Sequence, residues 1–169
     1  PVFNEARTLR EALDRVLAQS FVAEVIAVND ASTDSSKEIL DSITDPRVKV
    51  LHHEVNQGKG AAIRTGIHQA TAPYVGIQDA DLEYDPADLQ RLLTPLQAGL
   101  ADAVYGSRFL TSDYHRVLYF WHSVGNRALT LASNMLTNIN LTDMETCYKV
   151  FRRELIQSIT IEENRFGFE

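Results

Sequence analysis

The feature that most constrains the fold is a regular alternation of short apolar segments with longer amphipathic ones over roughly the first 110 residues. Short apolar segments typical of buried strands lie at 24–29, 48–52, 74–78 and 103–105. Between them, apolar residues recur at the spacing of an amphipathic helix at 7–19, 35–43, 61–70 and 87–98. This alternation predicts an α/β, Rossmann-like fold with a mostly parallel sheet and helices on both of its faces.

The pattern changes in the last third of the chain. Apolar residues at helical spacing predict one long helix over 119–138, with Trp121 and Met135 in its apolar stripe. We interpret this stripe as core packing, and an apolar platform for a lipid acceptor is the alternative. A strand at 146–151 and a helix at 153–159 complete the pattern. No linker or internal repeat appears, so the sequence predicts a single domain over all 169 residues.

Each polar motif of the alternating region follows a predicted strand. Ligands of parallel α/β sheets bind beyond the carboxyl ends of the strands. The motifs at such ends are Asn4-Glu5, Asn29-Asp30, Asp79-Ala80-Asp81 and Ser107-Arg108. This coincidence predicts a ligand site at that edge of the sheet.

The Asp79-Ala80-Asp81 motif places two carboxylates two residues apart, directly after a strand. In a loop both carboxylates can turn toward one point, where they repel each other unless a cation lies between them. Mg²⁺ and Mn²⁺ prefer such hard oxygen ligands and share their coordination with substrate phosphates. The alternative is a helix cap and turn that Glu83, Asp85 and Pro86 would assist. The position at a strand end favours the metal site.

Two further motifs have both a ligand-binding and a structural interpretation. Asp30 can accept hydrogen bonds from a nucleobase edge, whereas Asp34 alone suffices to cap the next helix. Gly58-Lys59-Gly60 can bring backbone N–H groups and an ammonium to a diphosphate, or can form a plain turn. It matches neither the Walker loop nor the dinucleotide fingerprint, because Ile63 stands where the third glycine of the fingerprint belongs.

Charge and cysteine content exclude several classes of protein. The chain has 16 Lys and Arg against 23 Asp and Glu, a formal net charge of −7. Such a chain is not expected to bind nucleic acid, since phosphate-backbone affinity requires clustered cations. Cys147 is the only cysteine, so a disulfide within the chain is excluded and a small core thiol is expected. This cysteine usage suits a reducing, cytoplasmic location.

Five motifs, taken in order, resemble those of the inverting family 2 glycosyltransferases, which have the nucleotide-diphospho-sugar transferase (GT-A) fold. They cover roughly the first two-thirds of the chain and lie at 1–5, 29–34, 56–60, 78–81 and 106–109. Within the family, segments 79–83 and 142–151 resemble the dolichyl- and polyprenyl-phosphate sugar synthases. Three residues differ from the common pattern: Cys147 and Tyr148 replace Gly and Phe, and Asn29 replaces the first of two aspartates.

The resemblance implies a role for each motif. Asp79 and Asp81 would hold Mg²⁺ or Mn²⁺ on the diphosphate of a nucleoside-diphosphate-sugar donor. Arg108 would face a phosphate, through the fork of donors that a guanidinium offers, and Lys149 would be a second cation on the acceptor side. Lys59 would lie near the donor. The nucleoside pocket would be lined by Pro1, Asn4, Glu5 and Asp30.

The acceptor stays open between two chemistries. A polyprenyl- or dolichyl-type lipid phosphate is already anionic and needs no general base. A saccharide or protein hydroxyl, as in cell-wall or surface polysaccharide synthesis, needs a carboxylate to take its proton, for which Asp143 and Glu145 are the candidates. A nucleotide-sugar binding module without activity is a further alternative. A nucleotidyltransferase is rejected, because Asn4-Glu5-Ala6-Arg7 occupies the place of its basic glycine-rich loop.

The same resemblance places Pro1 at the end of the first strand of the fold. Most of that strand, and a part that follows Glu169, are therefore expected to lie outside the sequence. Peripheral membrane association, at the cytoplasmic face, is expected to come from those outside regions.

Overall fold

The computed structural model describes residues 1–107 and 120–168. Its strands are β1 (Val25–Asn29), β2 (Val48–His52), β3 (Tyr74–Gly76), β4 (Ala103–Tyr105) and β5 (Lys149–Arg152). Its α-helices are α1 (Leu9–Leu17), α2 (Ser36–Asp41), α3 (Lys59–Gln69), α4 (Leu89–Gln97), α5 (Phe120–Thr137) and α6 (Arg153–Ser158). Two 3₁₀ turns are η1 (Pro86–Asp88) and η2 (Phe166–Phe168). The element order that the sequence predicts is confirmed.

Some element boundaries differ from those expected. β3 ends at Gly76, because the chain then turns into the polar loop that carries the acidic motif. Pro86 opens a 3₁₀ turn before α4, and the Asp85 carboxylate accepts the N–H of Ala87 at 3.0 Å as its cap. The Asp34 carboxylate accepts the N–H of Ser36, the first residue of α2, at 3.0 Å, and so caps this helix as expected.

The strands form two separate sheets, one of two strands and one of three. β1 and β2 are parallel, with Val25 opposite Val48 and Asn29 opposite His52. The second sheet has the order β3-β5-β4, with β5 antiparallel to both β3 and β4. The α/β class is confirmed. The difference from the expected parallel pattern is β5, which returns from α5 and enters between β3 and β4.

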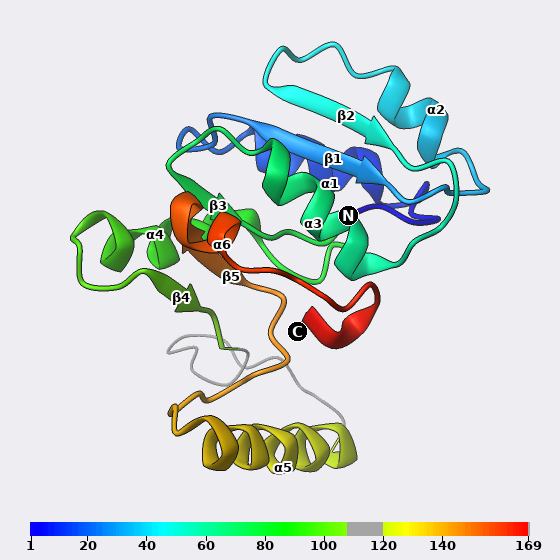
Figure 1. The fold of residues 1–169 in the computed structure, drawn as a ribbon. Helices are drawn as coiled ribbons and strands as arrows, with labels where there is room; N and C mark the ends of the chain where they lie inside the picture. The colour runs from blue at the N-terminus through cyan, green and yellow to red at the C-terminus, as the bar shows by residue number, and fades with distance from the viewer. Residues whose placement is uncertain (108–119, 169) are drawn as a thin grey trace.

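Helices cover both faces of β1 (Figure 1). Ala27 packs with Leu9 and Leu13 of α1. The neighbouring residue Val28 points to the opposite face, because side chains alternate along a strand. On that face the Cγ2 of Val28 lies 3.6 Å from the point that a Cβ would occupy if Gly66 of α3 had one. Helix α3 therefore packs closely on this face.

A cavity of about 420 Å³ is lined by residues of both sheets. Its walls are mainly apolar and come from α1, β1, α3 and β3. Val2 forms an isolated parallel bridge with Asn29, and its backbone N–H and carbonyl bond to Val28 and Asp30, both at 2.8 Å. The first residues of the chain therefore extend the edge of β1, and Pro1 lines the cavity together with residues 78–80.

Helix α5 forms over the predicted range, but its apolar stripe is not core. Figure 1 shows α5 as a separate rod below the rest of the molecule. Trp121 is 77% exposed, Met135 76% and Leu136 88%. The interpretation of this stripe as core packing is therefore wrong, because the polar side of α5 faces the protein instead. Among the described residues, no helix combines the length and hydropathy that crossing a membrane requires.

The segment before η2 covers the first turn of α3. The N–H of Gly60 donates to the carbonyl of Arg165 and that of Ala61 to Asn164, both at 3.0 Å. A Cβ on Gly60 would lie 2.3 Å from the carbonyl oxygen of Glu163, a distance that atoms do not tolerate. Glycine is therefore required at this position by the close approach of two backbones.

We expect Gly60→Ala to lower the free energy of unfolding by about 1–3 kcal/mol, because the segment must move away from α3. Gly66→Ala in the same helix is the matched control, since its Cβ would make only an ordinary contact. The control is expected to be neutral or stabilising by up to about 1 kcal/mol through helix propensity. Chemical denaturation measures both. Equal effects of the two substitutions would contradict the packing described here.

Candidate active site

The first two polar motifs are joined by hydrogen bonds around residues 4–6. Asn4 adopts a positive φ of 56°, and its side-chain oxygen accepts the N–H of Thr33 at 2.8 Å. The N–H groups of Asn4, Glu5 and Ala6 donate to Ser32, Ser36 and Asp34, at 3.0, 2.9 and 3.0 Å. The structure thus brings the predicted residues Asn4 and Glu5 to the 30–36 loop, beyond the end of β1.

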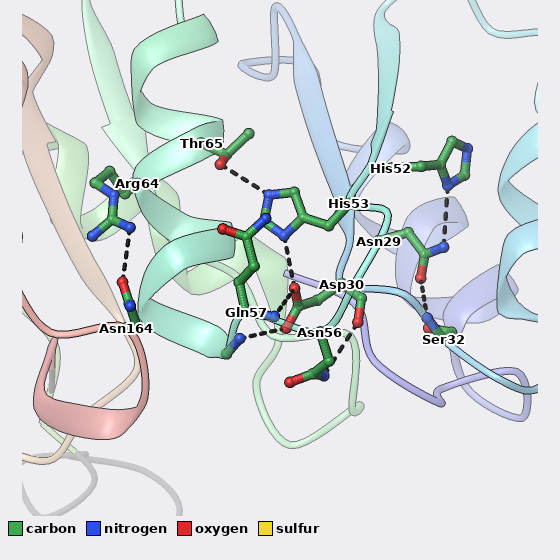
Figure 2. A network of polar contacts seen from close by, with 11 residues as sticks. Asn29, Asp30, Ser32, His52, His53, Asn56, Gln57, Arg64, Thr65 and Asn164 are labelled. Carbon is green, nitrogen blue, oxygen red and sulfur yellow. Dashed lines mark hydrogen bonds and ion pairs between the residues drawn. The ribbon is translucent and has the colours of Figure 1, made fainter.

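Asp30 lies at the centre of a network of donors (Figure 2). It is 3% exposed. Its Oδ1 accepts the N–H of Gln57 at 2.9 Å, and its Oδ2 accepts the N–H of Gly58 at 2.7 Å. His53 Nδ1 lies 2.7 Å from Oδ1, and His53 Nε2 lies 3.0 Å from the Thr65 hydroxyl. Because a carboxylate only accepts, Nδ1 carries the proton of this bond.

Asp30 therefore positions the loop before α3, a role that its place in the sequence did not reveal. A carboxylate has about four lone-pair sites. The three bonds above leave capacity on Oδ2, so the nucleobase contact expected for Asp30 stays a prediction.

Asn29 stands where the motif pattern has an aspartate, and both the oxygen and the nitrogen of its side-chain amide have hydrogen-bond partners. Its oxygen accepts the N–H of Ser32, and its nitrogen lies 3.1 Å from Nδ1 of His52 (Figure 2). A carboxylate could not donate to an unprotonated ring nitrogen, so asparagine suits this position when Nδ1 accepts.

The backbone of the Gly58-Lys59-Gly60 motif bonds to the chain itself. The amides of Gly58, Gly60 and Ala61 donate to Asp30, Arg165 and Asn164 respectively. These N–H groups therefore do not point at a free diphosphate site, and the hypothesis that they cradle one is not supported. The ammonium of Lys59, in the same motif, is instead directed to the acidic motif.

The ammonium of Lys59 reaches the acidic motif. Its Nζ lies 3.0 Å from Oδ2 of Asp79, and both side chains are about one-fifth exposed. This ion pair joins the start of α3 to the loop after β3, twenty residues further along the chain. The structure thus brings together two motifs that the sequence assigned to the donor site.

Asp81 shares this electrostatic environment. Burial raises the pKa of the Asp81 carboxyl above its usual value, and the carboxylates of Asp79 and Glu83 raise it further. The N–H of Glu83 donates to Asp81 at 3.0 Å and partly opposes the shift. A group whose charged form is disfavoured in this way gains from a cation nearby.

The acidic motif fits a divalent cation that has few protein ligands. Within residues 1–107 and 120–168, no three His, Cys, Asp or Glu side chains are grouped to hold a metal. Mg²⁺ is commonly held by only one or two carboxylates, with water and substrate phosphates as its other ligands. Asp79 and Asp81 are the two carboxylates that could supply such a donor set.

The residue that follows the single cysteine connects β5 to the acidic loop. The Tyr148 hydroxyl donates at 2.9 Å to the side-chain oxygen of Gln78, the residue that directly precedes Asp79 in the chain. Its ring lies 4.5 Å from that of Tyr84, and burial raises the pKa of the Tyr148 phenol. Phenylalanine, common at this position in the family, has no hydroxyl for this bond. Cys147 is buried, as expected.

Two candidate acceptor-side carboxylates, those of Asp143 and Glu145, are joined through α5. Asn126 Nδ2 donates to Asp143 Oδ1 at 3.1 Å and to Glu145 Oε2 at 3.0 Å. Asp143 is 1% exposed, and Lys149 is also buried. The Lys149 ammonium donates to the carbonyl of Thr146 and lies 5.4 Å from the ring centre of Tyr105. The sequence did not indicate that Asn126 contacts these candidate site residues, because its apolar neighbours dominate the helical pattern.

Arg108 was expected to face a phosphate, but it lies outside the described residues. Its predicted role is untested by the structure.

The comparisons with known proteins identify the family. Residues 1–160 match glycosyl transferase family 2. The chain belongs to this family, and the family assignment made from the motifs is confirmed.

Two curated relatives act on lipid phosphates according to their names. The polyprenol monophosphomannose synthase of Mycolicibacterium smegmatis is 28% identical, over 95% of this chain and 63% of its own. The undecaprenyl-phosphate mannosyltransferase of Micrococcus luteus is 29% identical, over the whole of this chain and 72% of its own. The matches span 54% and 41% of the length of two other curated relatives.

A solved structure supports the fold. The mannosyltransferase PcManGT of Pyrobaculum calidifontis, in complex with GDP-Man and Mn²⁺, superposes with a TM-score of 0.67 at 23% identity. The likeness covers 94% of this chain and 44% of that one. At this identity the likeness concerns the fold alone, and the predicted GT-A fold is confirmed.

We expect Asp30→Asn to destabilise the chain by about 1–3 kcal/mol, because the new NH₂ group meets a backbone donor and leaves it unsatisfied. The matched control is Asp14→Asn on the exposed side of α1, which is expected to change stability by less than about 0.5 kcal/mol. Hydrogen exchange of the Gln57 and Gly58 amides should become faster in Asp30→Asn only. Unchanged exchange would contradict the positioning role of Asp30.

Proposed function

We propose that the chain is the donor-binding catalytic domain of a glycosyltransferase that acts on a polyprenyl-phosphate-type lipid. The donor is a nucleoside-diphosphate sugar, and the transfer proceeds with inversion and a divalent cation. The observation that carries this proposal is the Lys59–Asp79 ion pair, which brings a cation to the acidic motif beside the loop that Asp30 holds. The two lipid-phosphate relatives support the acceptor class.

The donor would lie across the edge formed by the loops after β1 and β3. The loop held by Asp30, together with Asn4 and Glu5, would line the nucleoside part, and Pro1 would lie at the other side near residue 79. Lys59 would lie beside the diphosphate. This arrangement keeps the donor's anionic part next to the ion pair that connects the start of α3 to the loop after β3.

Asp79 and Asp81 would hold the cation, Mg²⁺ or Mn²⁺. When bound, it offsets the charge that develops on the departing nucleoside diphosphate. Lys59 would then add a second positive charge close to the same group, since its pairing with Asp79 already places it there. The raised pKa of Asp81 favours its use as a cation ligand, because a cation restores the charged form that burial disfavours.

The burial of Asp143 favours a phosphate acceptor over a hydroxyl acceptor. A general base must reach the proton that it takes. Asp143 is 1% exposed and accepts a hydrogen bond from Asn126, and Glu145 accepts from the same amide. A lipid phosphate needs no such base, because its oxygen is anionic at neutral pH. It would attack the anomeric carbon from the face opposite the leaving group, which inverts the configuration.

The acceptor class is tested with matched lipids. The chain is incubated with Mn²⁺, a panel of nucleotide sugars, and either a polyprenyl phosphate or the corresponding polyprenol. We expect glycosylated product from the phosphate only, because its oxygen is already anionic, whereas an alcohol needs a general base and Asp143 is buried. Mass spectrometry of the lipid fraction detects the product. Transfer to the polyprenol, or to an added saccharide instead, would overturn the proposed acceptor.

The cation site is tested by Asp81→Ala, for which Asp88→Ala on an exposed turn is the control. We expect Asp81→Ala to reduce Mn²⁺-dependent transfer by about 100-fold or more, because an anionic cation ligand is lost. Asp88→Ala should retain transfer within about twofold of the native chain. Circular dichroism establishes that both variants fold. Equal activity of the two variants would remove Asp81 from the site.

A further inference from the structure

Helix α5 turns its apolar residues outward and its polar residues toward the protein. Trp121, Met135 and Leu136 are mostly exposed, whereas Asn126 and Thr130 are buried. This is the reverse of an ordinary surface helix, whose apolar stripe faces the core and whose polar side faces water. The inversion needs a physical explanation.

Hydrogen bonds fix this orientation. Asn126, Thr130 and Asn134 recur every four residues and so lie on one face of α5. Asn134 exchanges two bonds with the backbone of Leu141, at 2.8 and 2.9 Å. The Thr130 hydroxyl accepts the N–H of Met144 at 3.3 Å, and Asn126 binds both acceptor-side carboxylates. The polar face is therefore the docked face, and the apolar face is left outward.

The outward face is wide and almost without charge. Successive helical residues are about 100° apart, so the exposed apolar residues cover close to half of the circumference. They are Phe120, Trp121, Val124, Leu129, Leu131, Met135 and Leu136. Arg127 is the only Lys, Arg, Asp or Glu in α5. A surface helix packs on a core through an apolar stripe of about 100°, and the seam of a helix pair is narrower. A planar apolar phase can contact a wider arc.

We propose that this face of α5 lies in the interface of a lipid bilayer. The proposal rests on the proposed function, because a polyprenyl phosphate is embedded in a bilayer with its phosphate at headgroup level. Interfacial amphipathic helices bury their apolar face by about 5–10 Å at the boundary of headgroups and acyl chains. Since Asn126 joins α5 to Asp143 and Glu145, this placement sets the acceptor side of the site at the depth of the lipid phosphate.

Trp121 is the only tryptophan of the chain and so reports directly on this face. The full chain is mixed with vesicles of phosphatidylcholine and phosphatidylglycerol. We expect the tryptophan emission to shift to shorter wavelength, brominated lipids to quench it, and the chain to float with the vesicles. All three effects follow if the ring leaves water for the interface.

Substitutions on and off the face separate specific from general effects. Met135→Glu and Leu136→Glu are each expected to lower vesicle binding by about tenfold or more, because a carboxylate must enter the interface. Leu100→Glu is the control, since Leu100 is 81% exposed and lies just after α4. It should bind vesicles like the native chain. Circular dichroism establishes that each variant folds.

Three results would overturn the proposal: no vesicle binding by the native chain, equal loss in Leu100→Glu, or a shift of emission with protein concentration alone. The last, with a dimer in sedimentation, would assign the face to a second copy of the chain. Binding of a nucleoside diphosphate with Mn²⁺, measured without vesicles, separates this proposal from the proposed function. Nucleotide binding without vesicle binding would reject the proposed bilayer contact of α5 and leave the proposed function in place. The opposite result rejects only the proposed function.

Discussion

The arrangement of the candidate site depends on the buried carboxylate of Asp30. A buried anion is stable only when donors surround it. Here the backbone of residues 57–58 and the ring of His53 supply those donors. Because they belong to the loop before α3, Asp30 fixes where that helix begins. The helix starts at Lys59, whose ammonium reaches Asp79. One buried charge thus sets the relative position of loops that follow three different strands.

Periodicity and strand-end motifs predicted much of this organisation. They gave the order of elements, the α/β class and the loops that meet at one edge, because these features depend on local patterns. The insertion of β5 between β3 and β4 was not predictable, since pairing partners far apart in the chain leave no local signal. The hydrogen bonds of Asp30 to the loop before α3 were also not predictable, because a carboxylate can accept hydrogen bonds from a loop or from a ligand equally well.

Helix α5 illustrates a different limit. Helical spacing shows which residues share a face, and it predicted the stripe of Trp121 and Met135 correctly. It does not show which face meets the protein. That choice is made by the backbone of 141–144 and the carboxylates beyond it, which offer hydrogen-bond partners to Asn126 and its neighbours. The apolar face is then left exposed, and the bilayer interface proposed above would cover it.

The central claim is that the loops after β1 and β3 bind a nucleoside diphosphate through a divalent cation. Calorimetric titration of the chain with UDP and with GDP, first with Mn²⁺ and then with EDTA, tests it most directly. We expect one nucleotide to bind with Mn²⁺ and to stop binding in EDTA. Binding that persists in EDTA, or no binding of either nucleotide by a chain shown to be folded, would contradict the claim.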